Sequence, residues 1–332
     1  MKKGIAALLC AALLCGLCGC TVTLPWDSGK NTMVMTVSGA DVGSDLYAYY
    51  LTALFKEPDK YGVDDPSDED AVEQAAIRLC TEYVAVNTAF REEGLRLSPA
   101  YKKEIAENVS TKWSFYQSYY TSVGITKQTL TQYETCEAKR RQMIAYLYGT
   151  GGTQAVSEVE WNANYAVNYV TFRSVNGYLT QTDDSGNASR LPDDKVAQAE
   201  DLFRTMCEAV RGGTSLEEVC RTNADSPYIL SSEPQTVTIN RETSNYPPEF
   251  FASVQKMDEG AARVIESSDY IFLVVKQSSK QDENLQAHRL ACLEEMCRDK
   301  FGAYLSAMIE GFHVQKNASA LRSLYDDVRK AF

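Results

Sequence analysis

Few side chains in this sequence have the chemistry of a nucleophile, a proton carrier or a metal ligand. Its two histidines are His288 and His313, and neither has carboxylates or thiols around it at the spacing of a zinc site. His288 and Cys292 share one face of an expected helix, where a thiolate and an imidazole could meet. A catalytic dyad usually joins separate elements and needs a third group to orient the base. We therefore interpret His288 as an exposed helical residue and expect no metal and no cofactor.

Cys20 carries a more specific signal. Two lysines precede an apolar run over 4–17, which is too short to span a bilayer and is typical of a secretory signal peptide. The run ends in Leu-Cys-Gly-Cys, which resembles a bacterial lipobox with Cys20 as the acylated residue. We expect a signal peptide over 1–19 and a lipidated tether over 20–31, anchored stably if two or more acyl chains are attached. An ordinary signal peptide cleaved elsewhere is the alternative.

The remaining composition excludes other classes of protein. The formal net charge is −12, and no basic stripe offsets it, so we expect no nucleic-acid partner. No later apolar run is long enough for a membrane span, which leaves the lipid as the expected anchor. The other cysteines are widely spaced, mostly within helical patterns, and we interpret most of them as small buried hydrophobes: Cys80, Cys136, Cys207, Cys220, Cys292 and Cys297.

Hydrophobic periodicity separates a helical part from a mixed part. Helices are predicted over 45–55, 70–93, 98–120, 129–148, 193–211, 284–309 and 318–330. Strands are predicted over 32–38, 169–175, 236–240, 262–266 and 270–276. The order is helices, then a small α+β unit, then helices again. This order predicts a mainly helical α+β protein in which a compact domain, 161–280, is inserted into a helical domain of 32–160 plus 281–332.

Several segments, in this order, resemble the PrsA/SurA class of secreted foldases. In that class a parvulin-type peptidyl-prolyl isomerase domain sits within a SurA-N-like helical chaperone domain. The similarity covers nearly the whole mature chain, but it rests on pattern more than on invariant motifs. The segments are Phe90-Arg-Glu-Glu-Gly-Leu-Arg-Leu-Ser98, 120–125, 197–203 with 212–220, Pro248-Glu-Phe-Phe251 with Met257-Asp-Glu-Gly260, and 268–276.

The resemblance also implies a pocket for the substrate proline, and this chain differs from the family at several positions of that pocket. Active parvulins usually carry histidines on the first and closing strands, where Tyr169 and Ile271 stand here. The pocket aromatic is retained as Phe250 or Phe251, and Tyr246 is a further candidate. These departures favour an isomerase that is weak or inactive. The alternative is an active isomerase in which Tyr169 donates a hydrogen bond, and it requires Tyr169, Tyr246, Phe250 and Ile271 to converge on one small cleft.

Aromatic residues on two faces of one predicted helix allow two interpretations. They are Trp113, Phe115, Tyr116, Tyr119 and Tyr120. In the first interpretation one stripe packs inward and the other covers a neighbouring helix. In the second they hold apolar segments of unfolded polypeptides.

The resemblance implies a chaperone or foldase for newly exported, unfolded chains. We expect it on the extracytoplasmic face of a bacterial cell membrane, with the lipid as its membrane contact. An active isomerase and a solute-binding or assembly lipoprotein remain as alternatives, and the sequence does not indicate an oligomeric state.

Overall fold

The computed structural model describes residues 32–182, 186–230, 233–279 and 282–332, so the expected signal peptide, Cys20 and the whole tether lie outside the described residues. The chain divides into two compact units. The first combines the described residues up to Gln154 with Cys297–Phe332, and the second is Ala155–Met296. The second unit is wider than the expected insertion of 161–280, because it includes a further helix before the sheet and part of a long helix after it.

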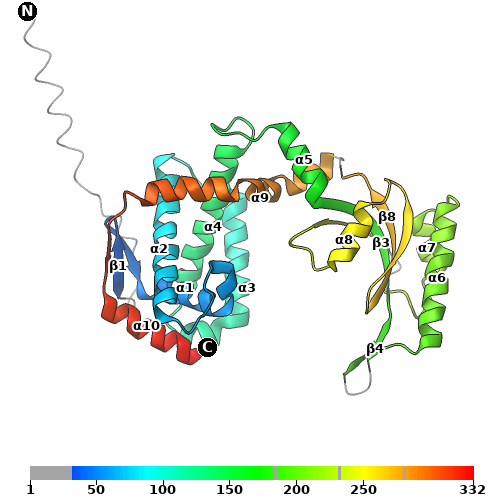
Figure 1. The fold of residues 1–332 in the computed structure, drawn as a ribbon, viewed down its shortest axis with the longest axis horizontal. Coiled ribbons are helices and arrows are strands. Elements are labelled where there is room, and N and C mark those ends of the chain that lie inside the picture. The colour runs from blue at the N-terminus through cyan, green and yellow to red at the C-terminus, as the bar shows by residue number, and fades with distance from the viewer. Residues whose placement is uncertain (1–31, 183–185, 231–232, 280–281) are drawn as a thin grey trace, which may run out of the picture. The chain divides into compact units, whose positions relative to one another are not determined.

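The first unit combines a group of helices with a small sheet at one edge (Figure 1). Its helices are α1 (Ser44–Lys56), the short η1 (Pro58–Tyr61), α2 (Glu69–Glu92), α3 (Pro99–Ser122), α4 (Lys127–Tyr148) and α10 (Ala318–Ala331). Its sheet has the order β2-β1-β9, from β1 (Met33–Val37), β2 (Ala40–Gly43) and β9 (Val314–Lys316). Both neighbours pair antiparallel with β1, so the end of the chain closes the unit against its beginning.

Helix α1 is the centre of this unit. Nine of its thirteen residues are buried, and a helix that is apolar on nearly every face must be surrounded by others. It packs against α2, α4 and α10. Its buried Asp45 accepts a hydrogen bond of 2.6 Å from the Thr129 hydroxyl. Thr129 also forms the capping box of α4 with Thr126, so this network joins the first turns of two helices.

The second unit is built on a four-stranded antiparallel sheet with the order β6-β3-β8-β7. The strands are β3 (Tyr169–Tyr178), β6 (Gln235–Asn240), β7 (Ala262–Glu266) and β8 (Tyr270–Gln277). A separate hairpin pairs β4 (Thr180–Thr182) with β5 (Ala188–Arg190). The helices are α5 (Glu158–Asn168), α6 (Asp193–Arg211), α7 (Leu216–Thr222), α8 (Pro248–Gln255) and the first part of α9 (Asp282–Ile309).

Opposite faces of this sheet carry two hydrophobic cores. Helices α6 and α7 lie on one side of β3 and β8, and α8 lies on the other (Figure 1). Alternate residues of β8 divide between the cores: Ile271 and Leu273 join the α6 core, whereas Phe272 and Val274 join the α8 core. The mainly helical α+β class predicted from the sequence is confirmed. No helix in the described part of the chain has the length and hydropathy of a membrane span.

The six cysteines in the described part of the chain are all buried. Burial raises the pKa of the Cys136 thiol to about 12 and that of Cys220 to about 11. A thiol with a raised pKa is a poor nucleophile, because the thiolate is the reactive form. The interpretation of the cysteines as small buried hydrophobes is therefore confirmed, and neither thiol has the environment of a catalytic residue.

Two glycines offer a paired test of the packing. A Cβ at Gly177 in β3 would meet the Tyr228 carbonyl oxygen and, at 2.7 Å, the Phe203 ring of α6. We expect Gly177→Ala to destabilise the second unit by about 1–3 kcal/mol through overpacking. A Cβ at Gly302 in α9 meets nothing within 4 Å, so Gly302→Ala should stabilise the first unit by about 0.5–1 kcal/mol.

Hydrogen exchange measured segment by segment separates these effects, because each variant should change protection mainly in its own unit. Unchanged protection of β3 in Gly177→Ala would contradict the close approach of α6 to this strand.

Candidate functional site

Six aromatic rings form a continuous surface on the α8 face of the second unit, which we call the sheet aromatic surface. Its members come from β3, β8, α8 and the segment before α8: Phe172, Tyr178, Tyr246, Phe250, Tyr270 and Phe272. Ring centroids are 4.6 Å apart for Tyr246 and Phe250 and 4.9 Å for Phe250 and Phe272. The contacts continue from Phe272 to Tyr270 at 6.0 Å and from Tyr270 to Tyr178 at 5.5 Å.

This surface changes from buried to exposed along the strands. Phe172 of β3 and Phe250 of α8 are fully buried between the sheet and the helix, whereas Tyr178 is 45% exposed and Tyr270 is 39% exposed. Tyr246 lies between these ends, half-buried, and burial raises the pKa of its phenol. The surface therefore consists of buried apolar rings with two exposed tyrosines at one end.

The position of α8 depends on both of its ends. Pro248 occupies the first turn, where a missing amide hydrogen is tolerated. At the other end the Lys276 ammonium donates to the carbonyl oxygens of Gln255 and Met257 at 2.7 and 2.6 Å. A cation at a helix C-terminus satisfies carbonyls that lack helical partners. Because Lys276 belongs to β8, this contact holds α8 against the sheet.

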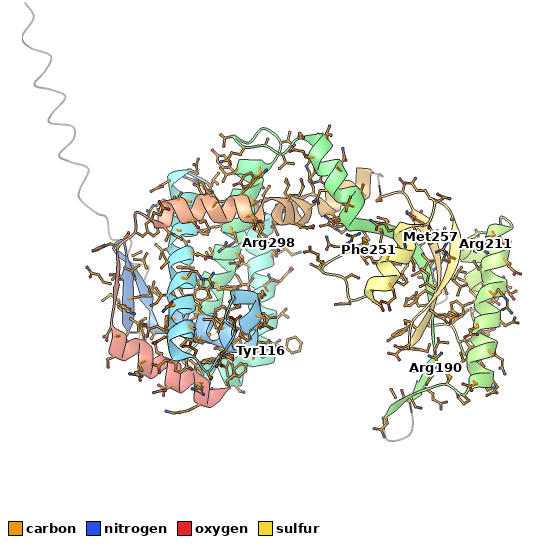
Figure 2. The ribbon with its side chains drawn as sticks, in the orientation of Figure 1. Tyr116, Arg190, Arg211, Phe251, Met257 and Arg298 are labelled. Atoms are coloured by element: carbon orange, nitrogen blue, oxygen red, sulfur yellow. The ribbon has the colours of Figure 1, made fainter. Side chains whose placement is uncertain are left out.

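Only some of the pocket residues suggested by the sequence come together. Tyr246 and Phe250 are in contact, and Phe251 is buried in the same core (Figure 2). Ile271 instead packs in the α6 core on the opposite face of the sheet. Tyr169 alternates to that opposite side too, where its ring stacks on Tyr165 at 4.6 Å. The four side chains on which the active-isomerase alternative depended thus do not share one cleft.

Neighbouring residues take the positions that sequence reasoning assigned to Ile271 and Tyr169. Phe272 and Phe172 contact Phe250, and Tyr270 and Tyr178 extend the surface. The alternation of side chains along a strand was the signal for this arrangement, since Phe272 follows Ile271 and must point to the other face.

Two buried polar groups also lie on this face of the sheet. The Ser174 hydroxyl and the Asn176 side-chain oxygen are buried without a hydrogen-bond partner among the described residues. They belong to the same alternating set of β3 residues as Phe172 and Tyr178. These groups could hydrogen-bond a bound amide, and the described part of the surface adds the phenol groups of Tyr178, Tyr246 and Tyr270.

His288 lies elsewhere and is not an exposed helical residue, contrary to expectation. Its ring is half-buried, 5.7 Å from the Tyr169 ring and 6.5 Å from that of Tyr165. Burial lowers its pKa. Tyr165 also stacks on Trp161, so α5, β3 and α9 meet in one aromatic column. The role of His288 in this column is packing.

The first unit has its own exposed rings, which we call the helical aromatic surface. Of the five aromatics predicted on α3, Tyr120 is buried in the core, and Trp113 and Tyr119 pack against it. Phe115 and Tyr116 remain 76% and 44% exposed, and Figure 2 shows Tyr116 at the outside of the unit. The helical aromatic surface consists of Phe55, Phe115, Tyr116, Tyr119 and Phe332.

Ring contacts join these side chains in two groups, Phe115 with Tyr116 and Phe332 with Tyr119 and Phe55. Phe332, at 62% exposed, lies 6.5 Å from Tyr119 and 6.0 Å from Phe55 between ring centroids. The Lys56 ammonium lies 4.9 Å from the centre of the Tyr116 ring, a distance at which a cation and a ring attract. The faces of such rings pack on apolar segments with little regard to sequence.

Comparisons with known proteins give similarity to solved structures alone. No family model matches the chain, and no curated protein matches it. It aligns with the foldase protein PrsA from Streptococcus pneumoniae over 90% of its length and 94% of that chain, at 11% identity and a TM-score of 0.38. The foldase PrsA from Lactococcus lactis aligns over 90% and 99%, at 17% identity and a TM-score of 0.38.

A structure from a report on PEB4 and Cj1289, two SurA-like chaperones of Campylobacter jejuni, aligns over 86% and 100%, at 12% identity and a TM-score of 0.32. Scores below 0.5 at these identities do not establish a shared fold or activity.

The lowered pKa of His288 predicts an acid-sensitive second unit. A fold that favours the neutral imidazole loses stability as pH falls below the unfolded value of about 6.5. We expect urea unfolding of the second unit to require less denaturant at pH 5.5 than at pH 7.5. His288→Gln should reduce this difference, because glutamine does not titrate. An equal pH dependence in both proteins would contradict the assignment.

Proposed function

We propose that the protein is a chaperone that binds unfolded, newly exported polypeptides, and that it has the PrsA/SurA-like organisation of a helical chaperone unit and a parvulin-like unit. The observation that carries the proposal is the helical aromatic surface. Leaving Phe115 at 76% and Phe332 at 62% exposed forgoes burial worth about 1.5–3 kcal/mol for a side chain such as phenylalanine. Exposed apolar patches are typical of interaction sites.

The chemistry of this surface suits a partner without fixed structure. A folded partner would be recognised by shape and by an array of hydrogen bonds, whereas Phe55, Phe115 and Phe332 carry no polar atom on their side chains. An unfolded polypeptide exposes scattered apolar side chains, which rings can hold in many registers. The negative charge of the chain keeps such a holder soluble and favours basic clients.

The apolar run over 4–17 and the lipobox-like ending support a location outside the cytoplasm for this activity. Acyl chains on Cys20 would hold the chaperone on the extracytoplasmic face of the membrane, where exported chains emerge unfolded. A lipid anchor does not require any of the described helices to span the membrane.

We also propose that isomerase activity is weak or lost. Prolyl isomerisation needs no nucleophile, because its barrier of about 20 kcal/mol is the resonance lost as the amide twists, and stabilising the twisted amide lowers it. It does need hydrogen bonds aimed at the twisted amide, and His288 packs with Tyr165 and Tyr169 instead of with the sheet aromatic surface. The active isomerase remains the second candidate, now with Tyr246, Ser174 and Asn176 as its polar groups.

A solute-binding lipoprotein fits less well. Such a protein needs two α/β lobes around a hinge, whereas the described first unit consists of helices around three short strands.

Removing the two exposed rings of α3 tests the binding surface. We expect Phe115→Ala combined with Tyr116→Ala to weaken binding of a permanently unfolded, fluorescently labelled polypeptide about tenfold, because each truncated contact ring contributes on the order of 1 kcal/mol. Fluorescence anisotropy measures the dissociation constant. Thermal stability should be unchanged, since neither ring belongs to the buried core.

The matched control is Val159→Ala, which truncates a side chain that is 79% exposed in the second unit. Its affinity should equal that of the wild type. Equal weakening by both changes, or none by the α3 variant, would contradict the proposed surface.

The isomerase proposal predicts a flat result in a protease-coupled cis/trans assay on a short X-Pro peptide. The rate should stay within about twofold of the spontaneous rate at micromolar protein, because no group on the sheet aromatic surface matches the twisted amide as a histidine pair would. Clear acceleration that Tyr246→Ala abolishes, with the fold retained, would restore the active-isomerase alternative.

Anchoring is tested by Cys20→Ser, which removes the acylation site and leaves the apolar run in place. We expect the protein to move from the membrane fraction to the soluble extracytoplasmic fraction, because the acyl chains are its proposed anchor. Fractionation followed by immunoblotting measures this distribution. Full retention of the variant in the membrane fraction would exclude Cys20 as the anchor.

A further inference from the structure

Strand β6 is an open edge of the four-stranded sheet. It ends the strand order and pairs on one side with β3. The Arg241 amide donates to the Asn168 carbonyl at 2.8 Å, in the same register as the rest of the β3–β6 ladder. Hydrogen-bonded and non-bonded pairs alternate along an antiparallel ladder. Ile239 and Val237 therefore bond to β3, whereas the amide and carbonyl of Thr238 and Thr236 point away from it.

These outward groups have no partner within the described ranges. No hydrogen bond from a described residue reaches the backbone amide or carbonyl of Thr236 or Thr238 on the outer side. The strand reads Gln-Thr-Val-Thr-Ile-Asn, without the charge or proline that commonly blocks an edge. It is β-branched at four positions, which favours the extended backbone that pairing requires.

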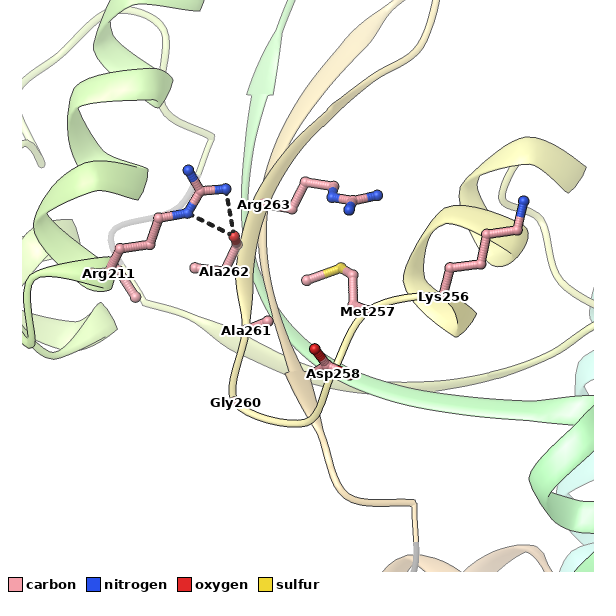
Figure 3. A pocket seen from close by; sticks show the side chains of 9 residues that line it. Arg211, Lys256, Met257, Asp258, Gly260, Ala261, Ala262 and Arg263 are labelled. Atoms are coloured by element: carbon pink, nitrogen blue, oxygen red, sulfur yellow. Dashed lines mark hydrogen bonds between the residues drawn. The ribbon is translucent and has the colours of Figure 1, made fainter.

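At the opposite edge of the sheet, a side chain blocks the outer side of β7. Helix α6 packs against β7, and the Arg211 guanidinium donates from Nε and Nη2 to the outward carbonyl of Ala262 at 3.1 and 2.9 Å (Figure 3). Arg211 also borders a cavity of about 440 Å³ beside β7. A long basic side chain thus occupies the place where another strand would bond to β7, and the described residues provide no such group at β6.

We propose that β6 binds an extended segment of an unfolded polypeptide as an added strand of the sheet. The inference rests on the proposed function and specifies how the second unit would contribute to it. Alternating donors and acceptors along one straight edge match the backbone of an extended chain, whatever its sequence. Backbone recognition of this kind suits a protein whose clients share no common sequence.

The two faces beside β6 define which segments fit best. The Val237 and Ile239 side chains lie on the α8 face, within or against its core. The other face presents threonines, and the Thr238 and Thr171 hydroxyls are 2.9 Å apart. An added strand would place alternate side chains on these two faces. The preferred segment therefore alternates apolar with polar or β-branched residues and contains no proline.

Thr236→Pro tests this proposal. It removes one outward amide and places a ring at the edge, and proline is tolerated at such an edge position. Thr236→Val is the matched control, because it keeps the amide and nearly the same side-chain shape. The probe is a short synthetic peptide of alternating threonine and valine with lysines at both ends. A second form of this peptide carries N-methyl groups along one edge.

Isothermal titration should show that the plain peptide binds the wild type and Thr236→Val equally. Thr236→Pro should bind it about tenfold more weakly, and the N-methylated peptide should fail to bind the wild type. Equal binding of both peptides would overturn the proposal, as would an unchanged affinity in Thr236→Pro. If Thr236→Pro does not fold, the two peptides on the wild type decide alone.

Two further outcomes separate this inference from the proposed function. If the plain peptide does not bind while the unfolded polypeptide still binds through Phe115 and Tyr116, strand addition is wrong and the chaperone proposal stands. A wild-type dimer in sedimentation that Thr236→Pro converts to monomer would show that a second copy occupies the edge, and this too overturns the proposal.

Discussion

The antiparallel pairing of β3 with β8 determines where each candidate side chain of the second unit points. Its register places Phe272 opposite Asn176 and Ile271 opposite Gly177. Because side chains alternate, Phe272 packs with Phe250 of α8 on one face of the sheet, and Ile271 packs with Phe203 of α6 on the other. The sheet aromatic surface follows from this register. The open edge follows as well, since the β3 groups that face away from β8 bond to β6 and leave the other groups of β6 unpaired.

In the first unit, the exposed rings follow from how α1 is enclosed. Helix α1 needs apolar neighbours on nearly every side, and α3 contributes Tyr120, with Trp113 and Tyr119 packed against the same core. Once these rings have met that need, Phe115 and Tyr116 have no buried position left. The five aromatic residues of α3 thus divide into three that pack in or against the core and two that stay exposed. The exposed pair, Phe115 and Tyr116, is available for function.

Local patterns were sufficient to predict most of the elements. Ser98 and Pro99 begin α3 at the predicted position, and the strands from β6 to β8 lie within a few residues of their predicted positions. The hairpin of β4 and β5 was missed, because its polar residues read as a loop. Helix α8 is short and begins at two prolines, so periodicity had little to detect.

The candidate site was harder to predict than the elements, because it depends on strand register. Phe250 and Tyr246 were identified from the resemblance, and they do lie together. Ile271 and Tyr169 were assigned to the same pocket, but each is one residue away in sequence from a position on the correct face. A shift of one residue reverses the face of every side chain in a strand. Pairing partners distant in the chain set that register, and a single strand does not reveal it.

Hydroxyl-radical footprinting is the most direct test of the central claim, that exposed aromatic rings hold unfolded polypeptides. The account predicts that Phe115 and Tyr116 are readily oxidised in the free protein and become protected when a permanently unfolded polypeptide is added to saturation. Tyr146, exposed in the same unit on α4, should react equally in both states and serves as the internal reference. Unchanged oxidation of Phe115 and Tyr116 while the polypeptide is demonstrably bound would contradict the account.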